Sequence, residues 1–336
     1  MVGGQVKAWT FSHGGYPRAL QQSVVPPDNE PLKPSEMRVT TYAASLNPVD
    51  AQLMGFPLWP YLPSFVIPSQ KGVAEDFSGV VQEAGPESGF KPGDEVFGIS
   101  PFLPGGTLQQ TMRLDTKKGS VVLPKPTDWS WEQAAALPLV WLTARTTIAE
   151  VERYATHGRV AVLGGSSATG MYAVYLAARR GWTVAASCSA RNADLVRSMG
   201  ASEMVDYTTE SVPDRLRAFA PDVIIDCVGG AECVGIAKRY VTIVSDKTNR
   251  LTMGGASTYL WNPQMVLRAL LGRLGLGPSY SCVNLEFRHS FLEEVLRLPK
   301  DKIMIDSTFG FDQVREAFRR LNTGRTRGKV IIRISA

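Results

Sequence analysis

The residues from Arg159 to Arg180 join a short apolar run, a turn of small residues and a helical pattern. The run Val160 to Leu163 is typical of a buried parallel strand. The turn consists of Gly164, Gly165, Ser166, Ser167, Ala168, Thr169 and Gly170. Apolar side chains then recur at helical spacing at Met171, Val174, Tyr175 and Ala178. Small residues let a backbone approach a pyrophosphate, and a helix N-terminus offers it unpaired N–H groups, so the stretch predicts a dinucleotide-binding unit.

The glycines of this turn depart from the pattern G-x-G-x-x-G, since Ser166 or Ala168 stands where a glycine is usual. Alone, such a pattern also fits a tight turn that binds nothing. The strand before the turn and the helix after it favour the nucleotide-binding interpretation. In that interpretation the cofactor is contacted by Gly164, Ser166, Ser167, Ala168, Thr169 and Gly170.

The size and composition of the chain are those of a two-domain globular protein. Its 336 residues suffice for two cores, and 44% hydrophobic against 20% charged residues is ordinary for soluble proteins. The formal net charge of +5 suits an anionic ligand, but the basic residues form no dense cluster, so nucleic-acid binding is not expected. No run approaches about 18 apolar residues, so we expect a cytoplasmic protein without signal peptide or membrane span. Free thiols are expected at Cys188, Cys227, Cys233 and Cys282, which have no paired spacing.

Two regions with different patterns follow one another along the chain. Up to about residue 125, short strands alternate with proline-rich turns, which indicates a barrel-like all-β unit. From Trp129 onward helix and strand alternate, with helical periodicity over 132–137 and 142–151. Strands are predicted at 160–163, 183–187, 204–205, 223–226 and 240–244, and a helix at 193–199 that ends at Gly200. Such alternation predicts a doubly wound parallel sheet.

Further elements are predicted toward the end of the chain. Asn262 and Pro263 open a capped amphipathic helix, which either borders a substrate cleft or packs on the core. Beyond Leu274 we expect an edge strand at 280–287, a helix at 290–298, a strand at 302–308, a helix at 312–321 and a last strand at 329–334.

Five segments in a fixed order resemble a known superfamily. They are A-S-L-N-P-V-D, D-F-S-G-V-V, K-P-G-D-E-V-F-G, A-A-L-P-L-V-W-L-T-A and G-K-V-I-I-R-I. Together with the nucleotide turn they are similar to the medium-chain dehydrogenases/reductases, above all to the zinc-free quinone reductases and the trans-acting enoyl reductases of polyketide pathways. The resemblance covers nearly the whole chain. It implies an α/β fold with a GroES-like β-barrel catalytic domain, residues 1–128 completed by 288–336, and a Rossmann NADP-binding domain, residues 129–287.

The residues after the second strand of the parallel sheet point to NADP(H) rather than NAD(H). NAD-selective sites place a carboxylate there, on the ribose 2′-OH, whereas this chain has Ser189, Ala190, Arg191 and Asn192, with no carboxylate until Asp194. Hydroxyl and guanidinium groups suit a 2′-phosphate, although Arg191 also fits a solvated helix start. The resemblance adds Tyr207 to this phosphate site. It also implies cofactor contacts for Asn47, Pro48, Asp50, Thr143, Gly328 and Lys329, although Asp50 also fits a turn residue and Thr143 an ordinary helix residue.

Zinc-dependent members of the superfamily use a cysteine and a His-Glu pair as ligands. This chain has only His13, His157 and His289, none in a metal-binding spacing, and each fits a surface or turn position. The segment from Lys71 to Glu75 stands where the family's G-H-E occurs. We therefore expect no metal.

Without zinc, the remaining chemistry is hydride delivery to an electron-poor carbon, for which the protein supplies orientation. Asn47 resembles the family's cleft asparagine, which holds the cofactor or a substrate carbonyl, and it also fits a purely structural turn. Enoyl reductases of the mitochondrial type carry a proton-donating tyrosine shortly after N-P-x-D, where this chain has Gly55-Phe56-Pro57. Tyr61 is the nearby candidate donor, with water or a more distant group as the alternative.

Together with the resemblance, these residues predict a reductase of a conjugated C=C bond that uses NADPH, and the resemblance to the trans-acting enoyl reductases implies a role in secondary metabolism. Its substrate would be an enone, quinone or enoyl thioester, either free or carrier-bound, and the protein a monomer or homodimer that binds neither nucleic acid nor membrane. A substrate wall is expected from Phe56, Trp59, Leu137 and Val140, whose aromatic members fit ordinary packing equally well. The alternative is an NADPH-binding protein with a structural or sensing role, which the missing tyrosine favours.

Overall fold

The computed structural model describes residues 5–12, 15–26, 28–56, 70–101, 103, 105–244, 246 and 262–335. The chain divides into two compact units, unit 1 with Met1–Leu139 and Phe287–Ala336, and unit 2 with Val140–Glu286. The segment 129–139, which we expected to open the second domain, clusters with unit 1. There its helix α2 (Trp131–Ala135) contacts β3 (Glu36–Leu46) and β5 (Asp76–Ala84). The catalytic and cofactor roles of the units stay predictions.

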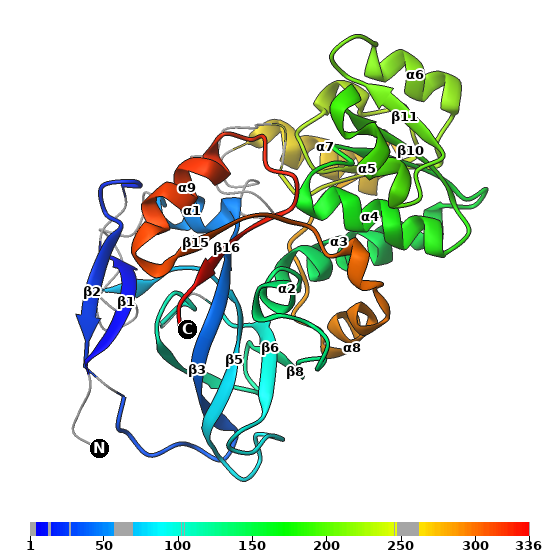
Figure 1. Ribbon diagram of the computed structural model, residues 1–336. Coiled ribbons are helices and arrows are strands. Elements are labelled where there is room, and N and C mark those ends of the chain that lie inside the picture. The colour runs from blue at the N-terminus through cyan, green and yellow to red at the C-terminus, as the bar shows by residue number, and fades with distance from the viewer. Residues whose placement is uncertain are drawn as a thin grey trace. The chain divides into compact units, whose positions relative to one another are not determined.

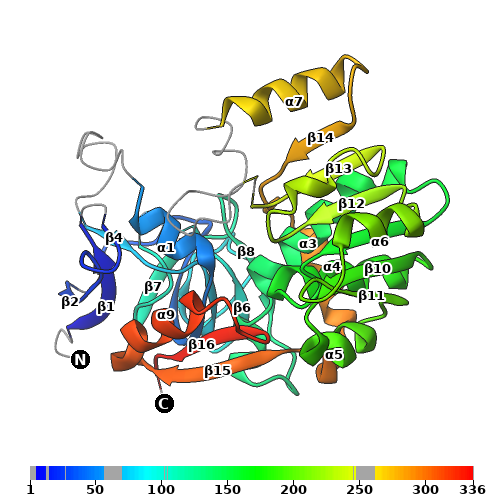
Figure 2. The same ribbon diagram turned by 90° about the horizontal axis from the view of Figure 1, so that it is seen from above.

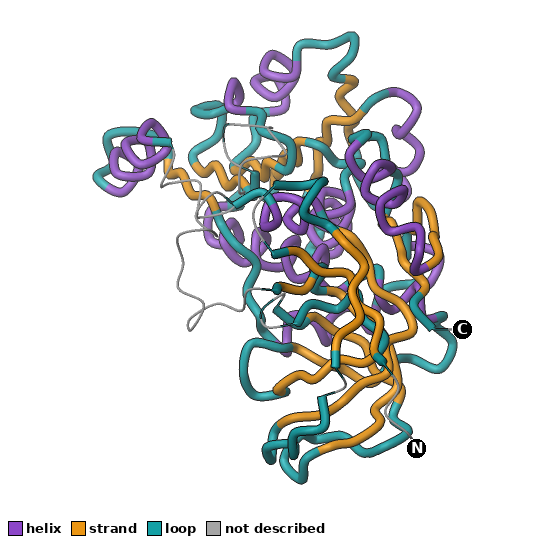
Figure 3. Tube along the Cα trace, turned by 90° about the vertical axis from the view of Figure 1, so that its left-hand side faces the viewer, coloured by secondary structure: helices purple, strands orange, loops and turns teal. Residues whose placement is uncertain are grey.

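Unit 1 is built mainly of strands, which Figure 3 shows as curved tubes running side by side. One sheet has the order β15-β16-β3-β5-β6-β8, with β7 paired to β3, and a second has the order β2-β1-β4. The strands not yet located are β1 (Val6–Phe11), β2 (Gln21–Val25), β4 (Lys71–Gly72), β6 (Glu95–Ile99), β7 (Thr111–Asp115), β8 (Val121–Pro124), β15 (Ile305–Gly310) and β16 (Lys329–Arg333). The helices α1 (Pro48–Met54), α8 (His289–Glu293) and α9 (Val314–Asn322) complete the unit (Figure 1).

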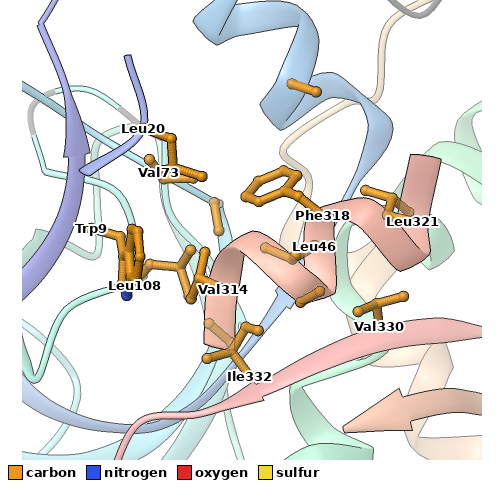
Figure 4. Packing of buried hydrophobic residues seen from close by; sticks show 14 of the residues in the cluster. Trp9, Leu20, Leu46, Val73, Leu108, Val314, Phe318, Leu321, Val330 and Ile332 are labelled. Atoms are coloured by element: carbon orange, nitrogen blue, oxygen red, sulfur yellow. The ribbon is translucent and has the colours of Figure 1, made fainter. Parts of the chain in front are cut away.

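The end of the chain is tied to its beginning through β16. This strand runs antiparallel to β3, with Val330 opposite Leu46. Figure 4 shows Phe318 and Leu321 of α9 packed over this pair, within a core that also includes Trp9, Leu20, Val73, Leu108, Val314 and Ile332. Each such buried side chain contributes about 1.5–3 kcal/mol relative to exposure. This core therefore fixes the register that brings the residues next to Leu46 and Val330 together.

Unit 2 contains a six-stranded sheet that is parallel throughout, with the order β11-β10-β9-β12-β13-β14. Figure 2 shows these strands side by side, from β14 beneath α7 to β11. Their bounds are β9 (Arg159–Leu163), β10 (Thr183–Cys188), β11 (Glu203–Asp206), β12 (Val223–Asp226), β13 (Arg239–Thr242) and β14 (Ser279–Cys282). The order reverses at β9, as in doubly wound dinucleotide-binding folds. The expected α/β class is confirmed.

The helices of unit 2 lie between successive strands as predicted, except between β12 and β13, where the chain forms only a 3₁₀ turn at Ala231–Cys233. They are α4 (Ala168–Arg179), α5 (Ala193–Ser198), α6 (Val212–Phe219) and α7 (Pro263–Arg273), together with most of α3 (Pro138–Val151). Gly200 follows α5 with a φ of 108°, which agrees with the predicted helix end. Among the described residues, no helix has both the length and the apolar character needed to cross a membrane.

Some predicted bounds were wrong. The strand expected at 280–287 ends at Cys282, because the chain then leaves the sheet and the Glu286 N–H donates to Thr146 Oγ1 of α3 at 3.0 Å. The helix expected at 290–298 is α8 followed by a 3₁₀ turn at Glu294–Arg297, and Pro299 disfavours helical backbone at the residue before it. The strand expected at 302–308 is β15, which begins three residues later, after a 3₁₀ turn at Lys300–Lys302.

Candidate functional site

The turn between β9 and α4 is held against β10 by its first two N–H groups. Gly164 N donates to Ser187 Oγ at 2.9 Å, and Gly165 N donates to the Ser187 carbonyl at 2.8 Å. Gly164 has a φ of +77°, and a Cβ there would lie 2.3 Å from a methyl group of Val228. A Cβ on Gly170 would lie 2.2 Å from the Gly164 carbonyl oxygen. Both positions therefore require glycine, although the glycines of this turn do not match the pattern G-x-G-x-x-G.

The first turn of α4 leaves hydrogen-bond donors available. Ser167 caps the helix, since its Oγ accepts from Gly170 N at 3.0 Å. The N–H groups of Ala168 and Thr169 have no acceptor within the described part of the chain, as the first turn of a helix requires. An anion placed there would accept hydrogen bonds from these two N–H groups and would lie at the positive end of the helix dipole. The residues predicted to contact the cofactor phosphates thus lie together in one turn.

The short segment after β10 carries the residues predicted to hold the 2′-phosphate. Asn192 is only 6% exposed, and its Nδ2 lies 3.3 Å from Ser166 Oγ and 3.4 Å from Ser189 Oγ. Its Oδ1 has no hydrogen-bond partner within the described residues. Asn192 therefore links the phosphate turn to the end of β10, while Arg191 is exposed.

A carboxylate from the neighbouring strand lies beside this segment, although the sequence from Ser189 to Ala193 contains none. Parallel pairing of β10 and β11 places Asp206 opposite Cys188. Asp206 Oδ2 accepts from Ala190 N at 3.2 Å, and Oδ1 accepts from the hydroxyl of Thr208 at 2.7 Å. The hydrogen bonds from Thr208 lower the pKa of Asp206, so it is ionised at neutral pH. The signal was present in the sequence, because neighbouring parallel strands end at the same edge of a sheet.

Sequence reasoning also missed Asp226, at the end of β12. Its Oδ1 accepts from the N–H groups of Val228, Gly229 and Gly230 at 2.9, 2.7 and 3.1 Å. Its Oδ2 accepts from the hydroxyl of Thr242 at 2.9 Å. Burial raises the pKa of Asp226. This carboxyl shapes the loop that places Val228 against Gly164.

Unit 1 contains a second cluster of predicted site residues, centred on Asp76, which was not predicted. Lys329 donates to Asn47 Oδ1, and its Nζ lies 3.1 Å from Asp76 Oδ2. The same oxygen accepts from Asn47 Nδ2 at 2.9 Å and from Ser45 Oγ at 2.7 Å. Asp76, Asn47 and Lys329 are 0%, 1% and 2% exposed. Asp76 Oδ1 accepts from Leu139 N at 2.7 Å, so one buried carboxylate joins three segments of the chain.

Asn47 therefore has a structural role in addition to any role toward a ligand. Both ends of its side-chain amide are hydrogen-bonded inside the unit, which leaves one N–H and one lone pair. It also immediately precedes α1, where Asp50 Oδ2 accepts from Asn47 N at 2.7 Å. The turn-residue interpretation of Asp50 agrees with this bond.

Asp50 is a buried acid with an unused oxygen. It is 2% exposed, and its Oδ1 has no hydrogen-bond partner in the described residues. Burial, together with the nearby Glu75 carboxyl, raises the pKa of Asp50 well above its ordinary value. Asp50 therefore keeps its proton to a higher pH than an exposed aspartate does.

The other predicted site residues are placed as follows. Leu137, Val140 and Thr143 are buried, Pro48 begins α1, and Phe56 packs against the core cluster of unit 1. Gly328 has a φ of +110°. Tyr61 and Trp59 lie outside the described residues, as does His13. His157 and His289 pair with surface carboxylates, Asp222 and Glu293, which agrees with their predicted surface positions. The four cysteines are free and buried.

Comparisons with known proteins show which family the chain belongs to. A family model described as zinc-binding dehydrogenase matches residues 199–332. The chain is 32% identical over 330 residues to the NAD(P)H oxidoreductase RTN4IP1, mitochondrial, of Mus musculus, across 90% of this chain and 82% of that protein. It is 29% identical to the trans-enoyl reductase pgmF of Aspergillus terreus, across 98% and 96% of the two chains. The solved quinone oxidoreductase from Coxiella burnetii matches with a TM-score of 0.78 and 25% identity, over 99% and 100%. The identity and coverage show that the chain belongs to the medium-chain dehydrogenase/reductase superfamily, among its zinc-binding dehydrogenase relatives.

Proposed function

We propose that this protein is an NADPH-dependent reductase that delivers hydride to a conjugated C=C bond without zinc. The observation that carries the zinc-free part of the proposal is the pairing of Asp76 with Lys329. Asp76 directly follows the segment that stands where zinc-dependent members of the superfamily have G-H-E, and its carboxylate is bonded to the Lys329 ammonium group. The names of the relatives, an NAD(P)H oxidoreductase, a trans-enoyl reductase and a quinone oxidoreductase, support the reaction class.

The donors of unit 1 that the structure describes do not fit a catalytic zinc ion. Such a site needs three protein ligands from histidine, cysteine and carboxylates, with a fourth position open. Among the described residues, no group of three His, Cys, Asp or Glu side chains is arranged to hold a metal. Asp76 Oδ2 already accepts from Ser45, Asn47 and Lys329, so a cation there would displace a buried ammonium. The donors described in unit 1 therefore support the proposal of a mechanism without zinc.

The residues of unit 2 fit NADP(H). The donors of Ala168 and Thr169, together with the required glycines at 164 and 170, would hold the pyrophosphate. Ser189, Arg191 and Tyr207 would hold the 2′-phosphate, and Tyr207 is 58% exposed beside Asp206. The bound nicotinamide would supply the hydride. The chain's own task is then to position both reactants and to exclude water.

The source of the proton that completes the reduction is a separate part of the proposal. Asp50 is a candidate donor, because it is buried next to Asn47 and its pKa is raised, so that it keeps its proton to a higher pH than an exposed aspartate. Tyr61 remains the candidate predicted from the sequence. Both require a substrate carbon within reach.

The substrate would be an enone, a quinone or an enoyl thioester, free or carrier-bound, within secondary metabolism. We propose a monomer or homodimer that acts in the cytoplasm, although the name of the Mus musculus relative includes "mitochondrial". The alternative, an NADPH-binding protein with a structural or sensing role, is favoured by Phe56. This side chain stands where enoyl reductases of the mitochondrial type have the donor tyrosine, and it packs against the core cluster of unit 1.

NADPH oxidation by the purified protein tests the proposal. Absorbance at the nicotinamide band is followed with a quinone, a simple enone and an enoyl thioester, before and after treatment with a zinc chelator. We expect turnover with at least one acceptor, unchanged by the chelator, and metal analysis well below one zinc per chain. Tight NADPH binding with no turnover on any acceptor would favour the non-catalytic alternative, and chelator-sensitive turnover would overturn zinc independence.

A further inference from the structure

We propose that Asp206 is a specificity-determining residue that opposes the 2′-phosphate of NADPH, so that the protein also accepts NADH. This inference rests on the proposed placement of the adenosine end of the cofactor at the carboxyl ends of β10 and β11. It differs from the sequence expectation, in which no carboxylate is available there.

The position of Asp206 follows from the parallel register of the sheet. Pairing of Cys188 with Asp206 brings the end of β11 beside the segment that follows β10. Asp206 Oδ2 accepts from Ala190 N at 3.2 Å. Ala190 stands between Ser189 and Arg191, the two residues of this segment proposed to bind the phosphate. The carboxylate therefore touches the backbone of the phosphate site itself.

The negative charge of Asp206 is not compensated by a neighbouring cation. Its hydrogen bonds come from Ala190 N and from the N–H and hydroxyl of Thr208, and no ion pair is found for it among the described residues. The neighbouring Glu210 differs, since its carboxylate is bonded to Arg215 at 2.8 Å. An ionised, unpaired carboxylate bonded to Ala190 N, one residue before Arg191, reduces the attraction that this segment exerts on a phosphate.

Asp206 thus acts on the cofactor in two separable ways. As a hydrogen-bond acceptor it positions Ala190, which affects NADPH and NADH alike because both contain the same adenosine. As a negative charge it repels only the 2′-phosphate, which NADH lacks. The ratio of the two dissociation constants cancels the first effect and isolates the second.

The segment should survive the loss of Asp206 because a second contact holds it. Asn192 Nδ2 lies near both Ser189 Oγ and Ser166 Oγ, at 3.4 and 3.3 Å, and its side chain is buried. Removal of the bond to Ala190 N therefore leaves the segment attached to the phosphate turn.

The test is titration of NADPH and NADH, by nicotinamide fluorescence, into the wild-type protein, Asp206→Asn and Asp194→Asn. Asp194 is the matched control, since its carboxylate lies on the neighbouring α5, is 98% exposed and pairs with Arg197 at 2.7 Å. For charges roughly 7 Å apart, with a dielectric between about 20 and 80, we expect Asp206→Asn to shift the affinity ratio toward NADPH by about 3- to 50-fold. Asp194→Asn should change the ratio by less than about twofold.

Equal weakening of both cofactors by Asp206→Asn, or no change in the ratio, would overturn the inference and leave Asp206 a positioning residue. Asp206→Ser also removes the charge, with a smaller side chain, and must shift the affinity ratio in the same direction. It takes the place of Asp206→Asn if the Asp206→Asn protein does not fold. Arg191→Ala separates this inference from the proposed cofactor site. If Arg191→Ala leaves NADPH binding unchanged, the placement of the phosphate is wrong. If it weakens NADPH binding while the Asp206 variants leave the ratio unchanged, only the role of Asp206 is wrong.

Discussion

Lys329 Nζ lies 3.1 Å from Asp76 Oδ2, and both side chains are almost completely buried. The two residues are 253 positions apart in sequence. Their pairing depends on β16 joining β3 and on β5 lying on the other side of β3. A buried charge that loses its partner destabilises the native state far more than a surface charge does.

Lys329→Met should therefore lower the free energy of unfolding by about 3–5 kcal/mol. Lys117→Met is the matched control, because Lys117 and Glu87 form an ion pair of 2.6 Å in which both side chains are more than half exposed. The control should change stability by less than about 1 kcal/mol. Urea unfolding measures both, and a similar small loss for the two variants would show that the buried pair contributes little.

Asn47→Ala should reduce stability as well as turnover. The substitution removes bonds to Lys329 and to Asp76, and hydrogen bonds to charged groups contribute about 1.5–3 kcal/mol each. Ser45→Ala, which removes a single bond to the same Asp76 oxygen, should cost less. An Asn47→Ala protein with an unchanged unfolding midpoint and reduced turnover would instead assign Asn47 to the ligand alone.

Asp50→Asn should stabilise the protein relative to the wild type, and this gain should increase as pH rises. The native state keeps the Asp50 proton above the ordinary pKa of 3.8, whereas the unfolded chain releases it near that value. The native state then binds more protons than the unfolded state, so the contribution of Asp50 to stability falls as pH rises through this window. Asparagine carries no titrating proton and keeps an acceptor for Asn47 N.

Thermal midpoints of wild type and Asp50→Asn, measured between about pH 4 and pH 8, check this sign. The difference in favour of the variant should grow with pH. A difference that stays constant would mean that Asp50 ionises normally in the native state.

Gly170→Ala should disturb the nucleotide turn. The added Cβ would lie 2.2 Å from the Gly164 carbonyl oxygen, so the start of α4 must shift. Overpacking of this kind costs about 1–3 kcal/mol, and we expect NADPH affinity to fall together with stability. Gly277→Ala is the control, because its Cβ would meet only Leu271 at 3.7 Å. Full NADPH affinity in Gly170→Ala, measured by titration, would contradict the assignment of this turn.

The sequence by itself determined the elements that depend on neighbouring residues. The strand, turn and helix from Arg159 to Arg180 were predictable because hydrophobic periodicity and small residues act locally. The alternation of helices and strands in turn determined the parallel sheet of unit 2. Element ends were less predictable, as at Cys282, because contacts with other segments decide where a strand stops.

Only the tertiary structure decided which charged groups meet. Asp76 joins Asn47 and Lys329 because β3 lies between β5 and β16, and Asp206 reaches Ala190 because β10 and β11 pair in parallel. Strand order and register are set by packing over the whole unit, such as Phe318 and Leu321 against the β3–β16 pair. A local pattern contains no information about such distant partners, so the pairing of Lys329 with Asp76 becomes visible only in the folded chain.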